Sequence, residues 1–352
     1  MEQKKIYDLV VIGNGIAAQV FLWNLFLERK SQNFSVAVVS DEKIAPSCTL
    51  RSSATISLNG ISEDVSPLGD EMRKAYFLFL EFFNKYKPKG VVELNRHVIA
   101  TNENDEKKLT RRYKQISKVE SFLFKDIRTY QGVVYPSFLI CNQDYLNWFK
   151  AHNVPKYNEY HFFVKDIEVS PEGYYNLVFH SDSENEKGIS GKKILLATGA
   201  FSKIYHSFFK EIIGDEKEVK NEIKAGAYLE REIDLNCPSF YISIDSCNVL
   251  YRNLETNKIL QLGSSSVLGT YESANLSELQ HILKKCQEHL NVHLGELSDF
   301  KITTGLRHKA PKRMLECLES PVSPGVFHIN GLYKNGFSMS FLAAEKMMKL
   351  II

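Results

Sequence analysis

The chain has 352 residues, of which 44% are hydrophobic, and its 44 Lys and Arg residues nearly balance its 42 Asp and Glu residues. This composition is typical of a folded globular protein and excludes a disordered chain, which is poorer in apolar residues and carries more net charge. The formal net charge of +2 gives no overall field that attracts nucleic acid or anionic lipid.

The length and the apolar runs set the expected organisation. A chain of this length predicts about two domains of ~150 residues each. No apolar run approaches the ~18 residues that cross a bilayer, and no small-residue cleavage site follows the first strand-like run. The six cysteines form no C-x-x-C pair, so we expect reduced thiols in a cytoplasmic protein without a membrane span.

The first forty residues predict a strand, a glycine turn, a helix and a second strand. Residues 6–12 (IYDLVVI) form a continuous apolar run, as expected for a parallel strand that is covered on both faces. Residues 16–29 have helical composition, and residues 35–39 (SVAVV) predict a second buried strand. Together these segments predict a βαβ unit.

The rest of the chain mixes predicted strands and helices. The predicted helices are residues 73–86, 143–151, 276–290 and the segment after Gly336. The predicted strands are residues 91–101, 161–169, 174–180, 193–197, 224–231, 240–244, 248–252, 259–263 and 325–330. The charged spans 102–114 and 181–187 predict solvated surface.

The glycine turn of the βαβ unit predicts a dinucleotide site. In the pattern Gly13-x-Gly15-x-x-Ala18, the first glycine permits the tight turn and the second lets backbone approach a pyrophosphate. Ala18 permits close packing of helix on strand, and the N–H groups of Ile16, Ala17 and Ala18 lie at the positive end of the helix dipole.

The ribose of such a dinucleotide is usually held by an acidic residue at the end of the second strand. Here Ser40 occupies that place and Asp41 follows it. Two readings therefore stay open, in which either the Asp41 carboxylate or the Ser40 hydroxyl binds the ribose.

Two later segments resemble one family of flavoproteins. The run Lys193 to Ala200 (KILLATGA) resembles the apolar strand ending in A-T-G of flavoproteins with two dinucleotide loops. The run 327–340 (FHINGLYKNGFSMS) resembles the second flavin-binding loop of the D-amino-acid oxidase (DAO) family, closest to its glycine oxidase members. The preceding segment 304–307 (TGLR) resembles the family's G-L-R-P motif.

Further segments resemble the same family in the same order. Residues 49–54 resemble the Ser- and Arg-rich loop along the flavin, and Val164 lies in a strand like the one whose backbone meets adenine. Residues 249–263 resemble the hairpin of the substrate domain. The resemblance implies an α/β fold in which a Rossmann-like FAD-binding domain (1–85, 150–222 and 301–352) accompanies an α+β substrate domain (86–149 and 223–300) on a mixed or antiparallel sheet.

The resemblance implies FAD as the cofactor and places its contacts on several loops. The implied contact residues are Gly13, Gly15, Ile16, Ala17, Ala18, Ser40, Asp41, Thr49, Arg51, Ser52, Ser53, Val164, Ala197, Thr198, Gly199, Gly331, Leu332, Tyr333, Lys334, Asn335, Gly336, Phe337 and Ser338. Independently of the family, Gly331 and Gly336 allow backbone close to a flat ring, and the N-terminus of the following helix stabilises negative charge there.

The implied reaction is oxidation of a C–N bond of an amino acid or related amine by hydride transfer to flavin N5. Oxygen or another acceptor then reoxidises the reduced flavin. Arg307 is the candidate that binds a substrate carboxylate. Lys334, Arg51 and Tyr251 are further candidates at the flavin or at the substrate.

Departures from the family pattern keep other functions open. His308 replaces the proline of G-L-R-P and a lysine or arginine follows at positions 309, 312 and 313, while Leu332 replaces a histidine. These changes indicate a substrate other than free glycine. The basic residues motivate a substrate carried on a macromolecule, such as a modified tRNA base or a carrier-bound amino acid, and the missing proline motivates a non-catalytic flavin-binding partner.

Metal and hydrolase chemistry find less support in the sequence. Cys286, His289 and His293 have spacings near those of metal ligands, but a structural zinc site needs a fourth ligand, and the interleaved leucines favour a packed helix end. The sequence has no G-x-S-x-G or phosphate-loop motif. We therefore predict no metal site.

Overall fold

The computed structural model describes two compact units of the chain. The described residues are 5–28, 34–58, 61, 64–112, 116–119, 121, 123–125, 129–132, 135–153, 156–180, 188–202, 222–244, 247–254, 257–265, 267–268 and 275–352. The first unit is built from Met1–Leu50, Leu146–Ile223 and Arg307–Ile352, and the second from Arg51–Tyr145 and Lys224–Leu306.

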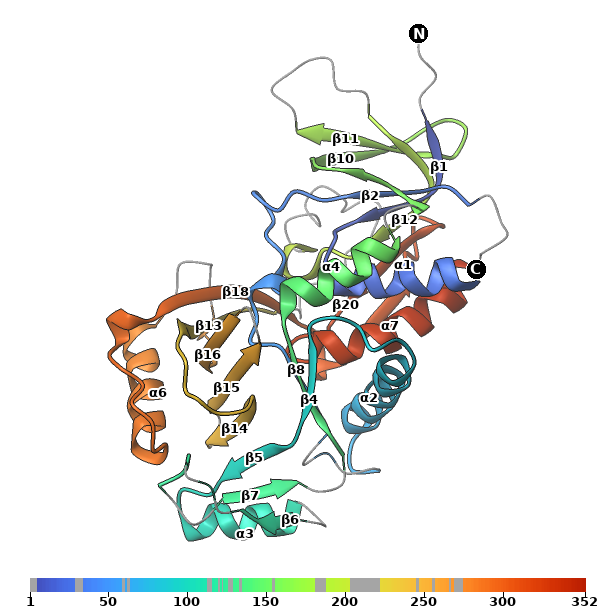
Figure 1. Cartoon of the computed structure of the whole chain (residues 1–352). Coiled ribbons are helices and arrows are strands. Elements are labelled where there is room, and N and C mark those ends of the chain that lie inside the picture. Colours follow the sequence, from blue (N-terminus) through green and yellow to red (C-terminus); the bar gives the residue numbers. More distant parts are fainter. Residues whose placement is uncertain are drawn as a thin grey trace. The chain divides into compact units, whose positions relative to one another are not determined.

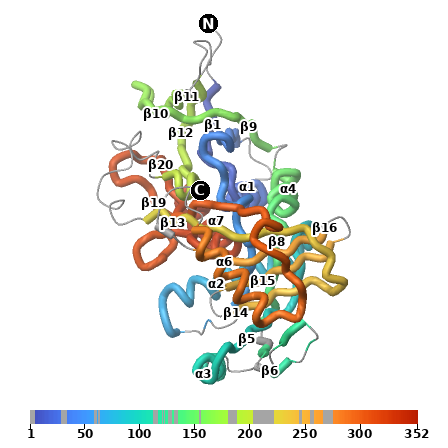
Figure 2. Tube along the Cα trace, turned by 90° about the vertical axis from the view of Figure 1, so that its left-hand side faces the viewer, coloured from blue at the N-terminus to red at the C-terminus, as the bar shows by residue number. Residues whose placement is uncertain are grey.

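The first unit contains an eight-stranded sheet. Its strands are β1 (Ile6–Ile12), β2 (Val36–Val39), β9 (Asn158–Tyr160), β10 (Phe163–Val169), β11 (Tyr175–His180), β12 (Ser190–Leu196), β19 (Glu316–Glu319) and β20 (Val326–Asn330). The order is β10-β11-β12-β1-β2-β9, and β20 pairs with both β12 and β19. β9, β2, β1, β12 and β20 run parallel, and β20, β12 and β1 can be followed as neighbours in Figure 2.

The centre of the parallel part of this sheet is buried because β2 and the end of β1 are apolar. All four residues of β2 are buried, as are the last four of β1. Helix α1 (Ile16–Glu28) packs against α7 (Gly336–Ile351), as Figure 1 shows, and both helices bury most of their residues. A helix that is apolar nearly all round belongs inside a core. This packing fixes both helix N-termini within the unit.

The second unit contains a nine-stranded and a three-stranded sheet. The large sheet follows the order β17-β13-β16-β15-β14-β5-β7-β6, with β18 paired to β13. Its strands are β5 (Arg96–Ile99), β6 (Ile116–Lys118), β7 (Thr129–Gly132), β13 (Glu222–Glu232), β14 (Phe240–Ile244), β15 (Cys247–Leu254), β16 (Asn257–Gly263), β17 (Val267–Leu268) and β18 (Lys301–Lys309). The small sheet is β3 (Thr55–Ser57), β8 (Ser137–Ile140) and β4 (Val91–Leu94).

Four helices complete the described regular structure outside α1 and α7. They are α2 (Pro67–Tyr86), α3 (Glu103–Arg112), α4 (Asn142–Asn153) and α6 (Leu276–His289). Short 3-10 turns cover Cys48–Arg51, Gly199–Phe201, Leu297–Asp299 and Pro311–Arg313. Within the described ranges, no helix combines the length and the apolar character that crossing a bilayer requires.

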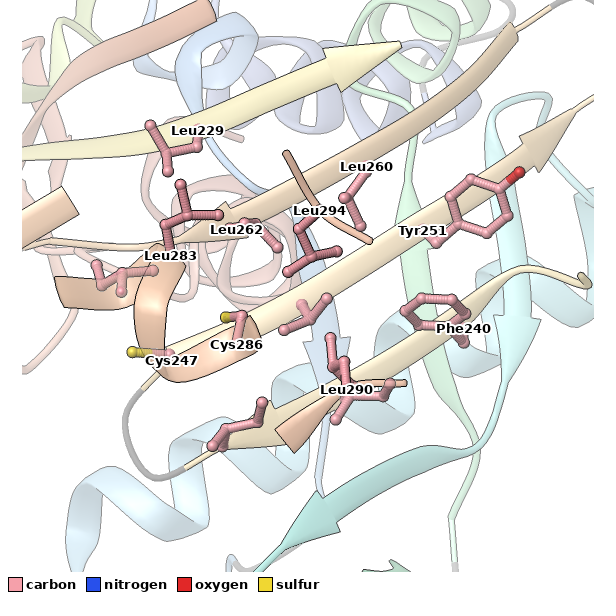
Figure 3. Packing of buried hydrophobic residues seen from close by; sticks show 14 of the residues in the cluster. Leu229, Phe240, Cys247, Tyr251, Leu260, Leu262, Leu283, Cys286, Leu290 and Leu294 are labelled. Atoms are coloured by element: carbon pink, nitrogen blue, oxygen red, sulfur yellow. The ribbon is translucent and has the colours of Figure 1, made fainter. Parts of the chain in front are cut away.

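The large sheet carries its core on the face toward α6. Alternate residues of β14 and β15, among them Phe240 and Tyr251, join Leu283 and Cys286 of α6 in one apolar cluster, which Figure 3 shows. Tyr251 is fully buried there, and its hydroxyl accepts a hydrogen bond from the N–H of Leu235 at 3.1 Å. We expected Tyr251 at the substrate, but this position makes it a core residue, because successive side chains of a strand point to opposite faces.

Most of the expected elements are present. The expected strand, helix and strand of the first forty residues correspond to β1, α1 and β2, so the βαβ prediction is confirmed. Helix α2 begins at Pro67, six residues before the expected start, because Ser66 caps it by accepting the Gly69 N–H at 3.1 Å. The expected strand 91–101 is two strands, β4 and β5, in different sheets.

The structural units differ from the expected domains mainly in one segment, with smaller shifts at residues 146–149, 223 and 301–306. Residues 51–85 lie in the second unit, whereas we grouped them with the nucleotide half. The reason is the packing of α2 on the small sheet, where Phe79 and Phe83 contact Phe138 with ring centroids 5.0 and 4.9 Å apart. The charged span 102–114, expected as solvated surface, forms α3 over residues 103–112, and residues 102–111 are exposed or half-buried.

The buried hydroxyl of Tyr251 yields a stability prediction. Tyr251→Phe leaves the Leu235 N–H without its acceptor, so we expect the free energy of unfolding in urea to fall by about 1 kcal/mol while FAD affinity stays unchanged. Tyr241→Phe is the matched control on the neighbouring strand, because its hydroxyl is 3.4 Å from Asn248 and lies on the opposite face. A Tyr251→Phe protein of normal stability with impaired substrate oxidation would contradict the core assignment.

Candidate functional site

The first glycine turn lies against the end of a neighbouring strand. Gly13 has φ +107°, and its N–H donates to the carbonyl oxygen of Val39 at 2.8 Å. A Cβ on Gly13 would lie 2.4 Å from the carbonyl oxygen of Ala197, at the end of β12. No residue other than glycine fits this place without a shift of backbone. The structure therefore brings the G-x-G turn and the A-T-G segment together.

The N-terminus of α1 opens at this turn. The first intrahelical bond runs from the Gln19 N–H to the Gly15 carbonyl at 3.1 Å, and the Ile16 N–H donates to Thr49 Oγ1 at 3.0 Å. Ala17 and Ala18 then present N–H groups for which helix geometry supplies no intrahelical acceptor. These donors and the helix dipole form an anion site.

The hydroxyls of residues 47 and 49 lie over the second glycine. A Cβ on Gly15 would be 3.2 Å from Thr49 Oγ1 and 3.3 Å from Ser47 Oγ. We expected Thr49 beside the flavin; its position in the structure is that of a cap on α1. No sequence motif points to Ser47, because only the fold brings its hydroxyl to a glycine turn that lies more than thirty residues away in the chain.

The A-T-G segment contributes an orphan hydroxyl. Thr198 Oγ1 is buried and has no hydrogen-bond partner among the residues that the structure describes. Gly199 has φ +56° and open space where a Cβ would lie, and its carbonyl oxygen accepts from Asn330 Nδ2 at 3.2 Å. A buried hydroxyl without a partner is unfavourable unless a ligand satisfies it.

The residues expected at the adenosine end, Asp41, Ser40 and Val164, all lie in the first unit. One oxygen of Asp41, Oδ1, already accepts N–H groups of Lys43 and Ile44 at 2.9 and 3.2 Å and so caps its own turn. Ser40 is half-buried, with its N–H bonded to the Tyr160 carbonyl at 3.0 Å. Val164, in β10, has a fully buried side chain beside an irregularity in the ladder.

A carboxylate from β9 reaches the first turn. Asn14 is buried inside the G-N-G turn and donates to Glu159 Oε1 at 2.6 Å, and its amide oxygen accepts from Gln19 Nε2 at 2.5 Å. Asn153 Nδ2 extends the network to Gln19 at 3.0 Å. This network stiffens the turn, and sequence patterns gave no signal for it because its members are spread over 145 residues.

The second glycine loop begins at the end of β20. Gly331 has φ +80°, and a Cβ there would lie 2.3 Å from the Met314 carbonyl oxygen. The loop closes with the Asn335 N–H bonded to the Leu332 carbonyl at 2.9 Å. Tyr333 adopts a left-handed φ of 43° and is half-buried. This conformation turns the chain sharply into α7.

Helix α7 starts at the glycine that ends the loop. Gly336 has open space at the Cβ position, and the first intrahelical bond is from the Met339 N–H to the Asn335 carbonyl at 2.9 Å. The N–H groups of Gly336, Phe337 and Ser338 are therefore the orphan donors of the helix. Phe337 is buried and Ser338 half-buried, so the loop presents backbone rather than bulky side chains.

Arg307 is a buried cation on β18. Its side chain is 7% exposed, and Nη1 is buried without a hydrogen-bond partner in the described part of the chain. Lys334, by contrast, is exposed, with Nζ 5.8 Å from the ring centroid of Tyr333. Of these two cations, Arg307 is the one with a buried N–H donor that has no acceptor in the described part of the chain.

Three candidate residues belong to the second unit. Arg51 lies with its backbone against Gly305, where a Cβ would be 2.7 Å from the Arg51 carbonyl oxygen. The Ser52 carbonyl accepts from Asn142 Nδ2 at 2.6 Å, while Ser52 Oγ is buried with no partner that the described chain supplies. Ser53 is half-buried in the same segment.

The second unit also contains a buried arginine beside Tyr251. Arg252 faces away from the α6 cluster, and its Nη2 donates to Gln261 Oε1 at 2.7 Å. Gln261 in turn donates to Glu230 Oε2 at 2.7 Å. Burial lowers the pKa of Arg252, and the nearby Cys141, Tyr228 and Glu230 partly oppose this.

The possible metal ligands at the end of α6 and just after it differ in burial. Cys286 is fully buried in the apolar cluster, and burial raises the pKa of its thiol to about 12. His293 is exposed and His289 half-buried. Cys286 therefore packs in the apolar cluster at the C-terminal end of the helix.

The two loops of the first unit fit a flavin dinucleotide. The first offers a glycine turn, the N–H groups of α1 and the orphan hydroxyl of Thr198, which suit a pyrophosphate and its neighbours. The second offers a backbone loop with open space at Gly336 and the N–H groups of α7, which suit a ring that gains negative charge on reduction. These features define a protein of the class that binds FAD through two glycine loops.

The family comparison agrees with this class. The family model described as FAD dependent oxidoreductase (DAO) matches residues 8–350. The chain therefore belongs to the DAO family of FAD-dependent oxidoreductases, and its cofactor is FAD. The fold class expected from the sequence and the family resemblance are confirmed.

Solved structures of the same fold share little sequence with this chain. Glycine oxidase from Geobacillus kaustophilus has a TM-score of 0.74 at 16% identity, covering 98% of this chain and 94% of its own. Glycine oxidase from Bacillus cereus has a TM-score of 0.75 at 16% identity, with 98% and 97% coverage. FAD-bound L-α-glycerophosphate oxidase from Mycoplasma pneumoniae has a TM-score of 0.75 at 14% identity, with 99% and 95% coverage. A comparison with curated protein sequences finds no match.

The contact between Gly13 and Ala197 yields a prediction about FAD retention. Gly13→Ala places a Cβ 2.4 Å from a backbone oxygen, so we expect protein purified without bound flavin and an unfolding free energy lower by at least about 2 kcal/mol. Flavin absorbance per protein and urea denaturation measure the two effects. Gly173→Ala is the control, because Gly173 also has a positive φ of +82° but no atom within 4 Å of the Cβ position. Equal FAD loss in both variants would contradict the steric argument.

Proposed function

We propose that this enzyme oxidises a C–N bond of an amino acid or related amine and that Arg307 binds the substrate carboxylate. The observation that carries the proposal is the buried Nη1 of Arg307, which lacks an acceptor in the described chain. An uncompensated buried guanidinium is strongly unfavourable, whereas a carboxylate accepts from it in a bidentate arrangement. The names of the two glycine oxidases support an amine substrate.

The chain supplies orientation rather than acid–base chemistry. When bound, FAD would supply the two-electron acceptor for the hydride of the carbon that bears the amine, and oxygen or another acceptor would take up the electrons. Arg307 fixes the carboxylate, and a held carboxylate fixes the direction of the Cα–H bond. The N–H groups at the start of α7 stabilise the charge that forms on reduction.

A macromolecule-bound substrate receives less support from the contacts of the basic segment. Lys309 Nζ lies 2.8 Å from Glu222 Oε2, so its charge is paired within the unit. The Arg313 guanidinium lies 5.7 Å from the ring centroid of Tyr333. Lys312 is exposed. A phosphate-binding surface needs several cations that face solvent; Lys312 and Arg313 are both exposed, but Lys309 forms an ion pair and Arg313 also contacts an aromatic ring.

The state of the cysteines supports a cytoplasmic location. None of the six forms a disulfide, and three of them are buried. This state suits a reducing compartment, and we place the enzyme in the cytoplasm.

The proposal predicts a yellow protein whose flavin band bleaches anaerobically with an amino acid. In Arg307→Met, we expect FAD content to stay normal and kcat/KM for the amino acid to fall roughly 100-fold, because a desolvated charge pair contributes about 3 kcal/mol. The rate with the corresponding amine that lacks the carboxylate should change less than about threefold. Stopped-flow reduction of the flavin measures both.

Arg231→Met serves as the matched control for Arg307→Met. Arg231 bonds the Leu294 carbonyl at 2.8 Å and lies 3.5 Å from Asp299 Oδ2, on the α6 side of the large sheet. We expect normal kcat/KM in this variant. If no amine or amino acid reduced the flavin, the proposal would be overturned. If Arg307→Met lowered kcat/KM equally for the amino acid and for the amine, Arg307 would not be the residue that binds the carboxylate.

A further inference from the structure

The residue that departs from the family motif G-L-R-P touches the second glycine loop. His308 takes the place of the proline, is 5% exposed, and its Nδ1 lies 3.2 Å from the backbone nitrogen of Gly331. The N–H of Gly331 is the donor, so His308 Nδ1 is the acceptor and the ring proton resides on Nε2. A proline at this position has no side-chain acceptor, so this bond is a property of this chain.

The residues after His308 hold the same loop from a second side. The Cα of Gly331 packs so tightly that a Cβ would lie 2.3 Å from the Met314 carbonyl oxygen and 3.2 Å from Ala310 Cβ. Further along the loop, the Arg313 guanidinium lies 5.7 Å from the ring centroid of Tyr333. The segment 308–314 therefore contacts the first and the third residue of the loop.

The segment itself is anchored and sharply turned. Lys309 is paired with Glu222 at 2.8 Å, which ties the start of the segment to β13. Lys312 and Arg313 both adopt left-handed φ angles, 53° and 59°. Such angles are unfavourable for residues with a Cβ and persist only where surrounding contacts impose them. The turn they form carries Arg313 back over Tyr333.

We propose that His308 is a positioning residue that sets FAD affinity through the Gly331 N–H, with Arg313 as its second support on Tyr333. Of the basic residues that first indicated a macromolecular substrate, Arg313 is thereby assigned to the flavin loop. The physical reason is pre-organisation: if the loop occupies its flavin-binding conformation for only part of the time, the apparent affinity falls by that fraction. A buried N–H without an acceptor favours other loop conformations.

Two substitutions with the same amide group test the position of the acceptor. In His308→Asn the side-chain oxygen falls near the place of Nδ1, and in His308→Gln it falls near the place of Nε2. We expect the FAD dissociation constant, measured by titration of the apoprotein and flavin fluorescence, to rise roughly tenfold in His308→Gln and less than about threefold in His308→Asn. Arg313→Gln should raise it about two- to tenfold.

Lys312→Gln is the matched control, since Lys312 is exposed in the same turn. Its FAD affinity should equal that of the wild type. A second readout separates positioning from general stability: the rise in Tm on adding FAD should shrink in His308→Gln but not in His308→Asn. A His308→Gln protein with lower Tm but unchanged FAD affinity would overturn the proposal, as would equal affinities of the Asn and Gln variants. If His308→Gln does not fold, His308→Leu, which also lacks an acceptor at the place of Nδ1, takes its place in the comparison with His308→Asn.

These measurements do not depend on amine oxidation. A chain that binds FAD with the expected order of affinities but reduces it with no amine would refute the proposed substrate class and leave the role of His308 intact. A chain that oxidises an amino acid while all variants bind FAD equally would support the proposed substrate class and refute the role of His308.

Discussion

The close approach of Gly13 to the carbonyl oxygen of Ala197 is the constraint on which the first unit depends. It requires β1 and β12 to run parallel and to end together, and the parallel register from Ile6 to Ile12 provides this. With the strand ends aligned, the N-terminus of α1 and the orphan hydroxyl of Thr198 converge on one place. Packing between backbones thus creates the anion site before any ligand is present.

The second loop depends on an analogous contact with a different origin. Gly331 is held by the end of β18, through the His308 ring, and by the segment that follows, through the Met314 carbonyl. Arg307 and His308 are neighbours on one strand, so their side chains leave it on opposite sides. One strand therefore serves two purposes: His308 supports the flavin loop, and Arg307 keeps a buried donor for the substrate that we propose.

Contacts of this kind explain the departures from the family motif. The loss of proline after Arg307 looked like damage to the active site, and the gain of lysine and arginine looked like a surface for nucleic acid. In the structure, the replacement histidine bonds a loop glycine, one lysine is paired with Glu222 and one arginine covers Tyr333. Net charge along the sequence says nothing about which cations already have partners in the folded chain.

The sequence by itself determined the βαβ unit, both glycine loops and the family, because apolar runs and positive-φ glycines are local signals. The tertiary structure alone decided which side of a strand each residue occupies relative to the core, and so placed Tyr251 against α6. It also decided the partners of Thr49, Asn14 and His308, which lie 33, 145 and 23 residues away in the chain. Hydrogen bonds over such separations follow from packing of strands and helices, and no local pattern encodes them.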